Sequence, residues 1–523
     1  MAINKLNQYA SFLIKTFEGE VMASTSRGIT VNPIISEIAS WYERLRNAMD
    51  IREEEVILRA AIERILKRRL ILGGNGKKIA SPLIRELIWA RYFPDGSVPE
   101  KLIEDVAKTI DLHLALREHV LLNNHLKESD VNKWFYHLMS SKIEQVLNPN
   151  KEKEAMVNFM FHVLRDNIII KDDTEEEKDI QTLIAIRKAY AKDDLAFLRY
   201  HLFVQYFGNL SEKNINNIAN NFNSGFFEIE KQLIYPLRYK IYTYVKKQSP
   251  PFFILDDVLR SEKQNIHLLI NDEEKLKQAV YFICQKRYDS ITSRVQQAIV
   301  KSIIFIILTK ALIALAVEGT YENLIYGKVI WKSIALNVMI PPFLMIIATA
   351  FIKTPTQENS KRIYNRIQSL LFNAKPSAPY PVVLKLFPDK TRPFIDYVFG
   401  FLWFAAFFLS FGVCIFLLTK LHFNIVSQGV FLFFLAIVCF LFYRINRTAH
   451  TYTLETKQGL ITPVIDFFLM PIVQVGRYLT DGISQINIIL FVLDFIIETP
   501  FKGMFAFFEQ WFLFLNTKRE YLE

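Results

Sequence analysis

The residues with the clearest chemical potential are ionisable side chains inside long apolar stretches of the second half of the chain. Lys310 lies near the middle of the apolar stretch 298–317, eight residues before Glu318. A charge at that depth in a membrane is costly unless it is paired, hydrated or able to reach the interface, so it marks a transport pathway or a structural ion pair. Further charges that could share this role are Asp396, Asp466, Arg477, Asp494 and Glu498.

Two adjacent prolines, Pro341 and Pro342, occupy the middle of the next apolar stretch, residues 331–352. They remove two backbone donors, and the pair therefore predicts a break or kink in that helix. Broken helices close to buried charge are typical of substrate sites in transporters. A structural pair between Lys310 and a carboxylate is the alternative interpretation, and the sequence leaves both open.

The elements that must position these residues are membrane-spanning helices. A hydrocarbon core of roughly 30 Å requires about 20 apolar residues in helical form. Four stretches meet that length, at 298–317, 331–352, 394–419 and 427–443. Residues 460–515 add two amphipathic helices, with a turn expected at 480–482. These two helices either lie in the membrane interface or form a third transmembrane hairpin, so the chain has four spans or six.

The loop charges predict the orientation of these spans. Residues 353–392 carry eight basic and two acidic side chains, which places this loop, the N-terminal half and the C-terminus in the cytoplasm. We therefore expect an integral protein of a bacterial-type cytoplasmic membrane with both termini cytoplasmic. Residues 301–523 hold 20 basic and 13 acidic side chains, a balance that favours anionic lipid over nucleic acid as a partner. The candidate lipid contacts are Lys286, Arg287, Arg294, Lys361, Arg362 and Arg366.

Residues 1–297 have the apolar periodicity of helices almost throughout, and no run of alternating strands is evident. The fold class is therefore all-α, with a helical cytoplasmic N-terminal domain followed by a polytopic α-helical membrane domain. Polar breaks at 148–150, 171–179 and 249–251 suggest linkers. The expected domains are 1–148, 149–297 ending in a stalk helix that continues into the first span, 298–459 and 460–523. Expected helices include 100–125, 130–147, 153–168, 178–208 and 212–246.

A glycine-rich segment, residues 73–76, ends one expected helix, and Ser81-Pro82 is expected to start the next. The segment is not a phosphate-binding loop, because Ile71 and Lys78 stand where that motif has Gly and Ser or Thr. The nine histidines and three cysteines have no spacing typical of a metal site or a disulfide framework. We therefore predict no cofactor and no metal, and the absence of a catalytic constellation argues against an enzyme.

Two functions agree with these observations. The first is a membrane-anchored helical scaffold or receptor, in which the cytoplasmic bundle binds a protein partner or a second copy of the chain. The alternative is a channel or transporter for an ion or small solute, which uses Lys310, the Pro341-Pro342 break and the acidic stripes of 460–509. The two differ in one measurable property, because only the second predicts flux across a membrane.

Overall fold

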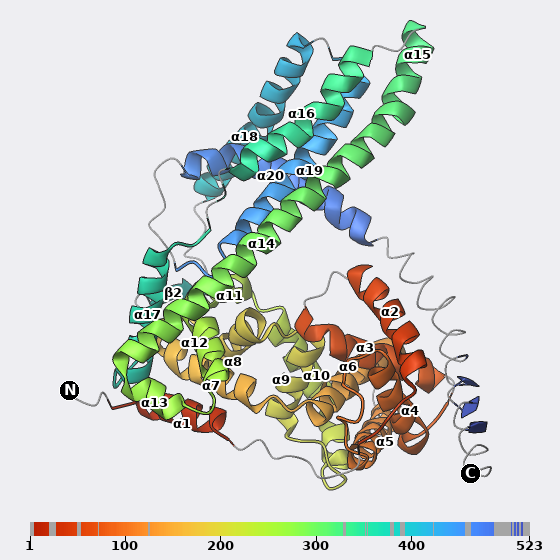
Figure 1. Cartoon of the computed structure of the whole chain (residues 1–523), viewed down its shortest axis with the longest axis vertical. Coiled ribbons are helices and arrows are strands. Elements are labelled where there is room, and N and C mark those ends of the chain that lie inside the picture. Colours follow the sequence, from red (N-terminus) through yellow and green to blue (C-terminus); the bar gives the residue numbers. More distant parts are fainter. Residues whose placement is uncertain are drawn as a thin grey trace. The chain divides into compact units, whose positions relative to one another are not determined.

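The protein is described by a computed structural model. It describes residues 5–19, 28–49, 54–71, 73–123, 126–327, 331–350, 352, 354–376, 381–386, 393–421, 423–454 and 462–485, with seven single positions between 504 and 515. Contacts divide the chain into two compact units (Figure 1). We call Asn4–Ser249 with Leu370–Leu386 and Ile488–Glu523 the bundle unit, and Pro250–Ser369 with Phe387–Asn487 and Met1–Ile3 the span unit.

The bundle unit is almost entirely helical in the residues described, as the all-α prediction requires. Its core joins α6 and α10 through aromatic rings, since Phe222 packs edge-on to Trp134 at 5.5 Å and stacks on Phe135 at 5.6 Å between ring centres. The helices are α1 (Gln8–Phe17), α2 (Pro33–Met49), η1 (Glu54–Val56), α3 (Ile57–Ile71), α4 (Gly76–Trp89), α5 (Lys101–Asn123), α6 (Glu128–Leu147), α7 (Lys151–Leu164), η2 (Arg165–Asn167), α8 (Glu175–Ile186), η3 (Arg187–Ala191), α9 (Leu195–Phe207), α10 (Ile215–Leu233) and α11 (Arg238–Gln248).

The glycine-rich segment ends α3 as predicted, but the next helix starts earlier than Ser81. Asn75 is the N-cap of α4, and its side chain accepts a hydrogen bond from the amide of Lys78. A Cβ on Gly76 would lie 2.0 Å from the carbonyl oxygen of Ala107, so glycine lets α4 begin in close contact with α5. The cap and this contact together move the helix start upstream, and Pro82 lies inside α4.

Two helices that were expected to be continuous are each interrupted. The expected helix 178–208 divides into α8, the π-helical turn η3 and α9, because Lys192 has a left-handed φ of 59° and Asp194 caps a new helix. The expected helix 212–246 divides into α10 and α11, with a turn at residues 234–237. The first interruption places Asp193 inside the unit, with the partly exposed Asp194 next to it.

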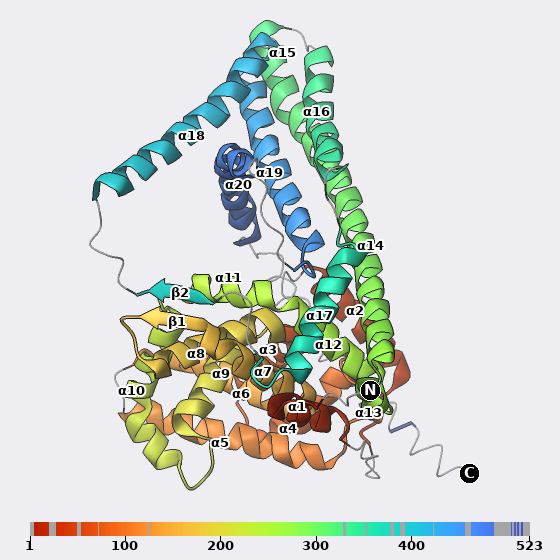
Figure 2. The same cartoon turned by 90° about the vertical axis from the view of Figure 1, so that its left-hand side faces the viewer.

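The bundle unit also contains one strand pair that sequence periodicity did not reveal (Figure 2). The strands β1 (Ile168–Lys171) and β2 (Val382–Lys385) are parallel, with Ile168 opposite Val382. Nearby residues of the same segment join the unit as well, because Asn7 donates to the carbonyl of Leu370 at 2.7 Å. The segment 370–386 therefore folds as part of the bundle unit, although it lies between two apolar helices in the sequence.

The span unit is helical in all of its described elements. They are α12 (Pro250–Ser261), α13 (Ile266–Asn271), α14 (Glu273–Ile313), η4 (Ala314–Gly319), α15 (Thr320–Tyr326), α16 (Trp331–Ala350), α17 (Gln357–Phe372, whose last turn enters the bundle unit), α18 (Pro393–Lys420), α19 (Ile425–Ala449) and α20 (Thr462–Gln485). As predicted, α14 runs unbroken from the stalk into the first apolar stretch, with Asp272 as its N-cap. Figure 2 shows the length of this helix beside α16 and α19.

Three helices in the described part of the chain are long and apolar enough to cross a membrane. They are Glu273–Ile325, which joins α14, η4 and α15, then Tyr397–Lys420 and Ile425–Ala449. In α16, the apolar helix Asn337–Ala350 is shorter by the same measure. The arrangement with four spans therefore stays a prediction.

Helix α20 packs on α18 and α19. A Cβ on Gly476 would meet the carbonyl oxygen of Ala436 at 2.0 Å, and Ser410 Oγ donates to the carbonyl of Phe468 at 2.8 Å. The turn expected at 480–482 is wrong, because α20 continues to Gln485. Thr480 stays within the helix by donating its hydroxyl to the carbonyl of Gly476 at 2.8 Å.

Candidate functional site

The strongest polar site in the span unit surrounds Lys310, which lies in the apolar part of α14. Its side chain is fully buried, and Nζ lies 4.8 Å from the ring centre of Phe434 and 5.2 Å from that of Phe431. Among the described residues, none forms a hydrogen bond with Nζ. Aromatic faces attract a cation, but they do not replace the hydrogen bonds that an ammonium group makes in water.

Glu318 is the candidate carboxylate partner of Lys310, and it too is fully buried. It lies in η4, a π-helical turn directly after α14. Its Oε2 accepts hydrogen bonds from Asn337 Nδ2 at 2.6 Å and Ser427 Oγ at 3.0 Å, whereas its Oε1 accepts none from the described residues. We call Lys310, Glu318, Asn337 and Ser427 the Lys310 cluster; it joins α14, η4, α16 and α19.

A second acidic residue follows one turn after Glu318. Glu322 in α15 is fully buried, and its Oε1 accepts a hydrogen bond from Asn424 Nδ2 at 3.1 Å. The same asparagine caps α19, because its Oδ1 accepts from the amide of Ser427 at 2.7 Å. The start of α19 thus holds both glutamates through neutral polar groups.

The prolines of α16 do not end their helix. The α-helical backbone continues from Trp331 to Ala350 with Pro341 and Pro342 inside, so the helix does not break, and the alternative of a kink stays a prediction. Packing against α14 and α19 keeps the helix together, and buried proline rings are apolar. Pro341 still removes the amide that would pair with the carbonyl of Asn337, one turn earlier. The prolines therefore loosen the backbone at a member of the Lys310 cluster.

The remaining predicted membrane charges are not joined to this cluster in the described structure. Arg477 lies on an exposed part of α20. The side chains of Asp396 and Asp466, and the whole of Asp494 and Glu498, lie outside the described residues. A pair between Lys310 and one of these four carboxylates stays a prediction, and among the described residues Glu318 is the acidic group that acts electrostatically on Lys310.

The predicted lipid contacts fall into two groups. Arg287 donates two hydrogen bonds of 2.5 Å to Asp257, and Arg362 pairs with Glu358 at 2.6 Å. Arg366 donates to Ser369 at 3.3 Å. Lys286, Arg294 and Lys361 are exposed. The three arginines named first already have protein partners. For the three exposed residues, contact with a lipid headgroup stays a prediction.

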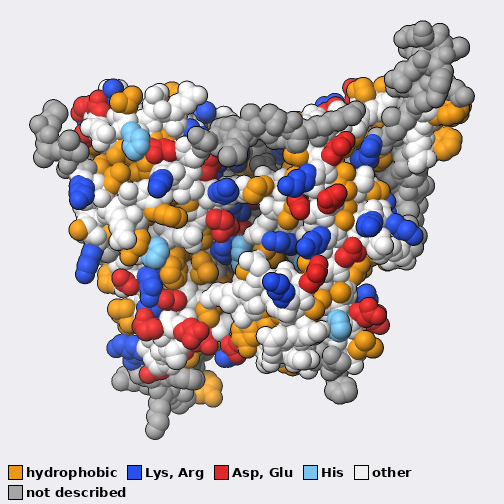
Figure 3. Space-filling view, turned by 90° about the horizontal axis from the view of Figure 1, so that it is seen from below, with side chains coloured by type: hydrophobic (Ala, Val, Ile, Leu, Met, Phe, Trp, Pro, Cys, Tyr) orange, Lys and Arg blue, Asp and Glu red, His pale blue; other side chains and the backbone are white. Residues whose placement is uncertain are grey.

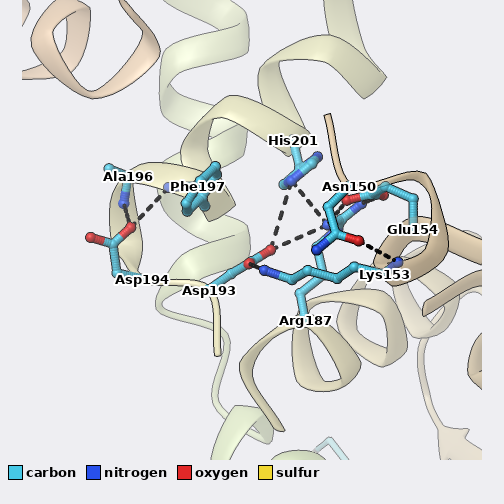
Figure 4. Close-up of polar contacts among 9 residues, drawn as sticks. All are labelled: Asn150, Lys153, Glu154, Arg187, Asp193, Asp194, Ala196, Phe197 and His201. Carbon is cyan, nitrogen blue, oxygen red and sulfur yellow. Dashed lines mark hydrogen bonds and ion pairs between the residues drawn. The ribbon is translucent and has the colours of Figure 1, made fainter. Parts of the chain in front are cut away.

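The bundle unit contains its own network of buried charges at the interruption between α8 and α9 (Figure 4). Arg187 donates to Glu154 at 2.7 Å and to Asp193 at 3.2 Å, and Lys153 reaches the other oxygen of Asp193 at 3.1 Å. His201 Nε2 lies 2.9 Å from the same guanidinium. A cavity of about 400 Å³ borders this network.

Asp194, the residue after Asp193, extends the network to α3. Asp194 caps α9 and also pairs with Arg59 at 2.6 Å. Arg59 pairs with Glu63 at 2.6 Å on its other side. Because Asp193 and Asp194 are adjacent, one loop connects ion pairs from α3, α7 and η3.

Burial sets the protonation of this network. It raises the pKa of Glu144, which lines the cavity, to about 8, because desolvation outweighs the attraction of Lys153 and Arg59. Burial also lowers the pKa of His201 to about 3, and the charge of Arg187 lowers it further. Burial alone would raise the pKa of Glu63, but Arg59 and Lys67 outweigh it and hold it at about 2. At neutral pH, Glu144 is therefore largely protonated and His201 is neutral.

Sequence reasoning missed several members of both sites. Asn337 and Ser427 are polar residues within or at the edge of apolar stretches, and this was the available signal. Glu322 follows the first apolar stretch and was not among the candidate charges. The adjacent pair Asp193-Asp194 was hidden inside a helix that was expected to be continuous.

Beyond the two networks of buried charge, the chain offers few further indications of its chemistry. No family model, curated protein or solved structure matches it. Within the described residues, no group of three or more His, Cys, Asp or Glu side chains is arranged to hold a metal ion. The three cysteines are not joined in disulfides. On the face shown in Figure 3, basic and acidic side chains lie side by side rather than in areas of one sign. The Lys310 cluster is therefore the feature with the most specific chemistry.

Proposed function

We propose that this protein is an integral membrane protein that moves an ion or small solute across the membrane through the Lys310 cluster. The observation that carries the proposal is the fully buried Lys310 ammonium, which has no hydrogen bond to the described residues and lies inside the longest apolar helix. An unpaired charge at such a position is expensive, and proteins keep such groups where they act on ions or substrates.

A purely structural ion pair would have a different geometry. Buried pairs offset their desolvation only when the charged groups touch and their remaining hydrogen bonds are made. Here Glu318 directs Oε2 at Asn337 and Ser427, and in the described structure its Oε1 and Lys310 Nζ both lack hydrogen-bond partners. This incomplete pairing favours the transport alternative over a structural role.

The proposed topology has four spans, with α16 as the span in addition to the three long apolar helices. Its 20 residues rise about 30 Å, which matches the hydrocarbon thickness. The pairing of β2 with β1 supports placing the bundle unit and the loop that precedes α18 on the same side of the membrane. The basic residues of that loop favour the cytoplasm for both.

Helix α20 is proposed to lie within the membrane beside α18 and α19 without forming a further span, because Gly476 contacts Ala436 near the middle of α19. It does not meet the length and hydropathy criteria for a span among the described residues. The exposed Lys286, Arg294 and Lys361 are proposed to contact anionic headgroups at the cytoplasmic interface.

The scaffold function is kept as a second candidate because one surface of the bundle unit supports it. Ile34, Ile38 and Trp41 in α2 are all exposed, at 58%, 47% and 61%, and their spacing places them on one helical face. Exposed apolar stripes of this kind are typical of protein or membrane contacts.

Flux through the purified full-length protein in liposomes tests the proposal. We expect flux of at least one ion or small solute in the wild type and its loss in Lys310→Ala. Lys361→Ala is the matched control, since Lys361 is exposed on α17 and outside the apolar helices. The absence of flux across a broad panel, from a monodisperse and correctly oriented sample, would overturn the transport proposal and favour the scaffold.

A further inference from the structure

Three buried atoms of the Lys310 cluster lack hydrogen bonds to the described residues, and their chemistry is complementary. Lys310 Nζ is a cationic donor, whereas Glu318 Oε1 and Asn337 Oδ1 are acceptors. All three side chains are fully buried. Buried polar atoms without partners are rare in folded proteins, and each of them requires an explanation.

Polar groups from three different elements meet at Glu318. Asn337 Nδ2 and Ser427 Oγ both donate to Glu318 Oε2, at 2.6 and 3.0 Å, so the Asn337 amide and the Ser427 hydroxyl lie next to the carboxylate. The carbonyl of Asn337 lacks its usual helical donor, because Pro341 has no N–H. Glu318 itself lies in a π-helical turn, a local widening that occurs frequently at functional sites. The result is a set of oxygens with one negative charge.

From this geometry we propose that Glu318, Asn337 and Ser427 form a binding site for a small monovalent metal cation, and that the Lys310 ammonium competes with that cation. The inference rests on the proposed transport function and names its ion. Oxygen ligands from carboxylate, amide, hydroxyl and carbonyl groups suit hard cations. At discontinuities of membrane helices, such oxygens coordinate sodium ions in transporters.

The charge of the cluster selects a monovalent ion. Glu318 and the Lys310 ammonium together carry no net charge, and burying additional charge in a low-dielectric region is costly. When a monovalent cation enters the oxygen set, the ammonium of Lys310 releases one proton to water, and the net charge of the cluster is unchanged. A divalent cation would leave an excess positive charge. The additional carboxylates that usually bind a divalent cation are also absent from this set.

Binding of radioactive sodium ion to the purified full-length protein in detergent, measured over a range of pH, tests the inference. We expect affinity in the wild type to rise with pH by up to about tenfold for each unit, which is the slope of one-for-one exchange with a proton. Glu318→Gln should abolish binding. Lys310→Met should bind sodium ion without that pH dependence.

Two further variants keep the result interpretable. Ser427→Ala changes little volume but removes one oxygen, and it should weaken binding at least about tenfold, the loss of about one good polar interaction. Glu358→Gln is the control, because Glu358 is an exposed carboxylate on α17. No sodium binding by the wild type at any pH would overturn the site. Binding unchanged in both Glu318→Gln and Ser427→Ala would also overturn it, and a Lys310→Met variant that keeps the wild-type pH dependence would overturn the exchange.

The failure of this inference can be told apart from the failure of the transport proposal. Sodium binding that depends on Glu318, in a protein without flux of any ion, would support the site and overturn transport. Flux of another solute by a protein that binds no sodium would support transport and overturn the site.

Discussion

Gly476 in α20 lies so close to Ala436 in α19 that a Cβ at this position would come within 2.0 Å of the Ala436 carbonyl oxygen. The contact is possible only because glycine has no side chain, and small residues are the usual means by which membrane helices approach closely. The contact joins the amphipathic helix α20 to the apolar helix α19. The sequence alone did not decide where α20 lies.

Gly476→Ala is therefore expected to lower stability by about 1 to 3 kcal/mol, the usual cost of forcing extra volume into a packed contact. Thermal unfolding in detergent would measure the change. Gly429→Ala in α19 is the matched control, because no atom lies within 4 Å of the position where its Cβ would be. Equal stability of the two variants would contradict the close packing of α19 and α20.

Lys310→Met is expected to change stability by less than about 3 kcal/mol, because the loss of a buried ammonium without hydrogen bonds offsets the cost of leaving the Glu318 carboxylate without its cation. Methionine keeps most of the side-chain volume and removes an ammonium group that makes no hydrogen bond to the described residues. Lys301→Met, at an exposed position earlier in the same helix, serves as the control for thermal unfolding. A large loss of stability in Lys310→Met alone would identify Lys310 as a structural residue instead.

Arg59→Met is expected to destabilise the bundle unit by about 3 kcal/mol, because it removes the shared cation of the buried Glu63 and the partly exposed Asp194. The comparison is Arg362→Ala, which removes an exposed pair with Glu358 and should cost at most about 1 kcal/mol. Denaturant unfolding of the full chain gives both values. Similar costs for the two arginines would show that the buried network contributes little.

Glu144→Gln is expected to remove part of the pH dependence of stability. Since burial raises the pKa of Glu144 from 4.5 to about 8, the folded state favours the protonated form. The corresponding stability is fully present below pH 4.5 and is lost as pH rises towards 8, by at most about 1.4 kcal/mol for each unit.

Melting temperatures of the wild type and Glu144→Gln, compared between mildly acidic and alkaline pH, would measure this effect. Glutamine mimics the protonated acid, so the variant should equal the wild type in acid and exceed it in alkali. The neutral His201, whose pKa is about 3, acts in the opposite direction, because protonation in acid destabilises the fold. Parallel pH profiles for the two proteins would show that Glu144 does not titrate in this range.

Local patterns predicted the helical class correctly, because apolar periodicity and capping are properties of neighbouring residues. The unbroken helix α14 is an example, since no glycine or proline interrupts it between Glu273 and Ile313. Local patterns failed where tertiary contacts compensate for a helix breaker. Pro341 and Pro342 remain inside α16, while the apparently regular stretch before Asp194 is interrupted.

The sequence by itself determined that this protein is helical and that its second half holds long apolar helices. It also showed that Lys310 is an ionisable residue within one of them. Only the tertiary structure decided that Asn337 and Ser427 bind Glu318, that aromatic rings face that lysine, and that β2 pairs with β1. Hydrophobic length and periodicity act within one element, so a single sequence contains them. Contacts between distant elements depend on how several helices pack together, and neither spacing nor composition specifies that packing.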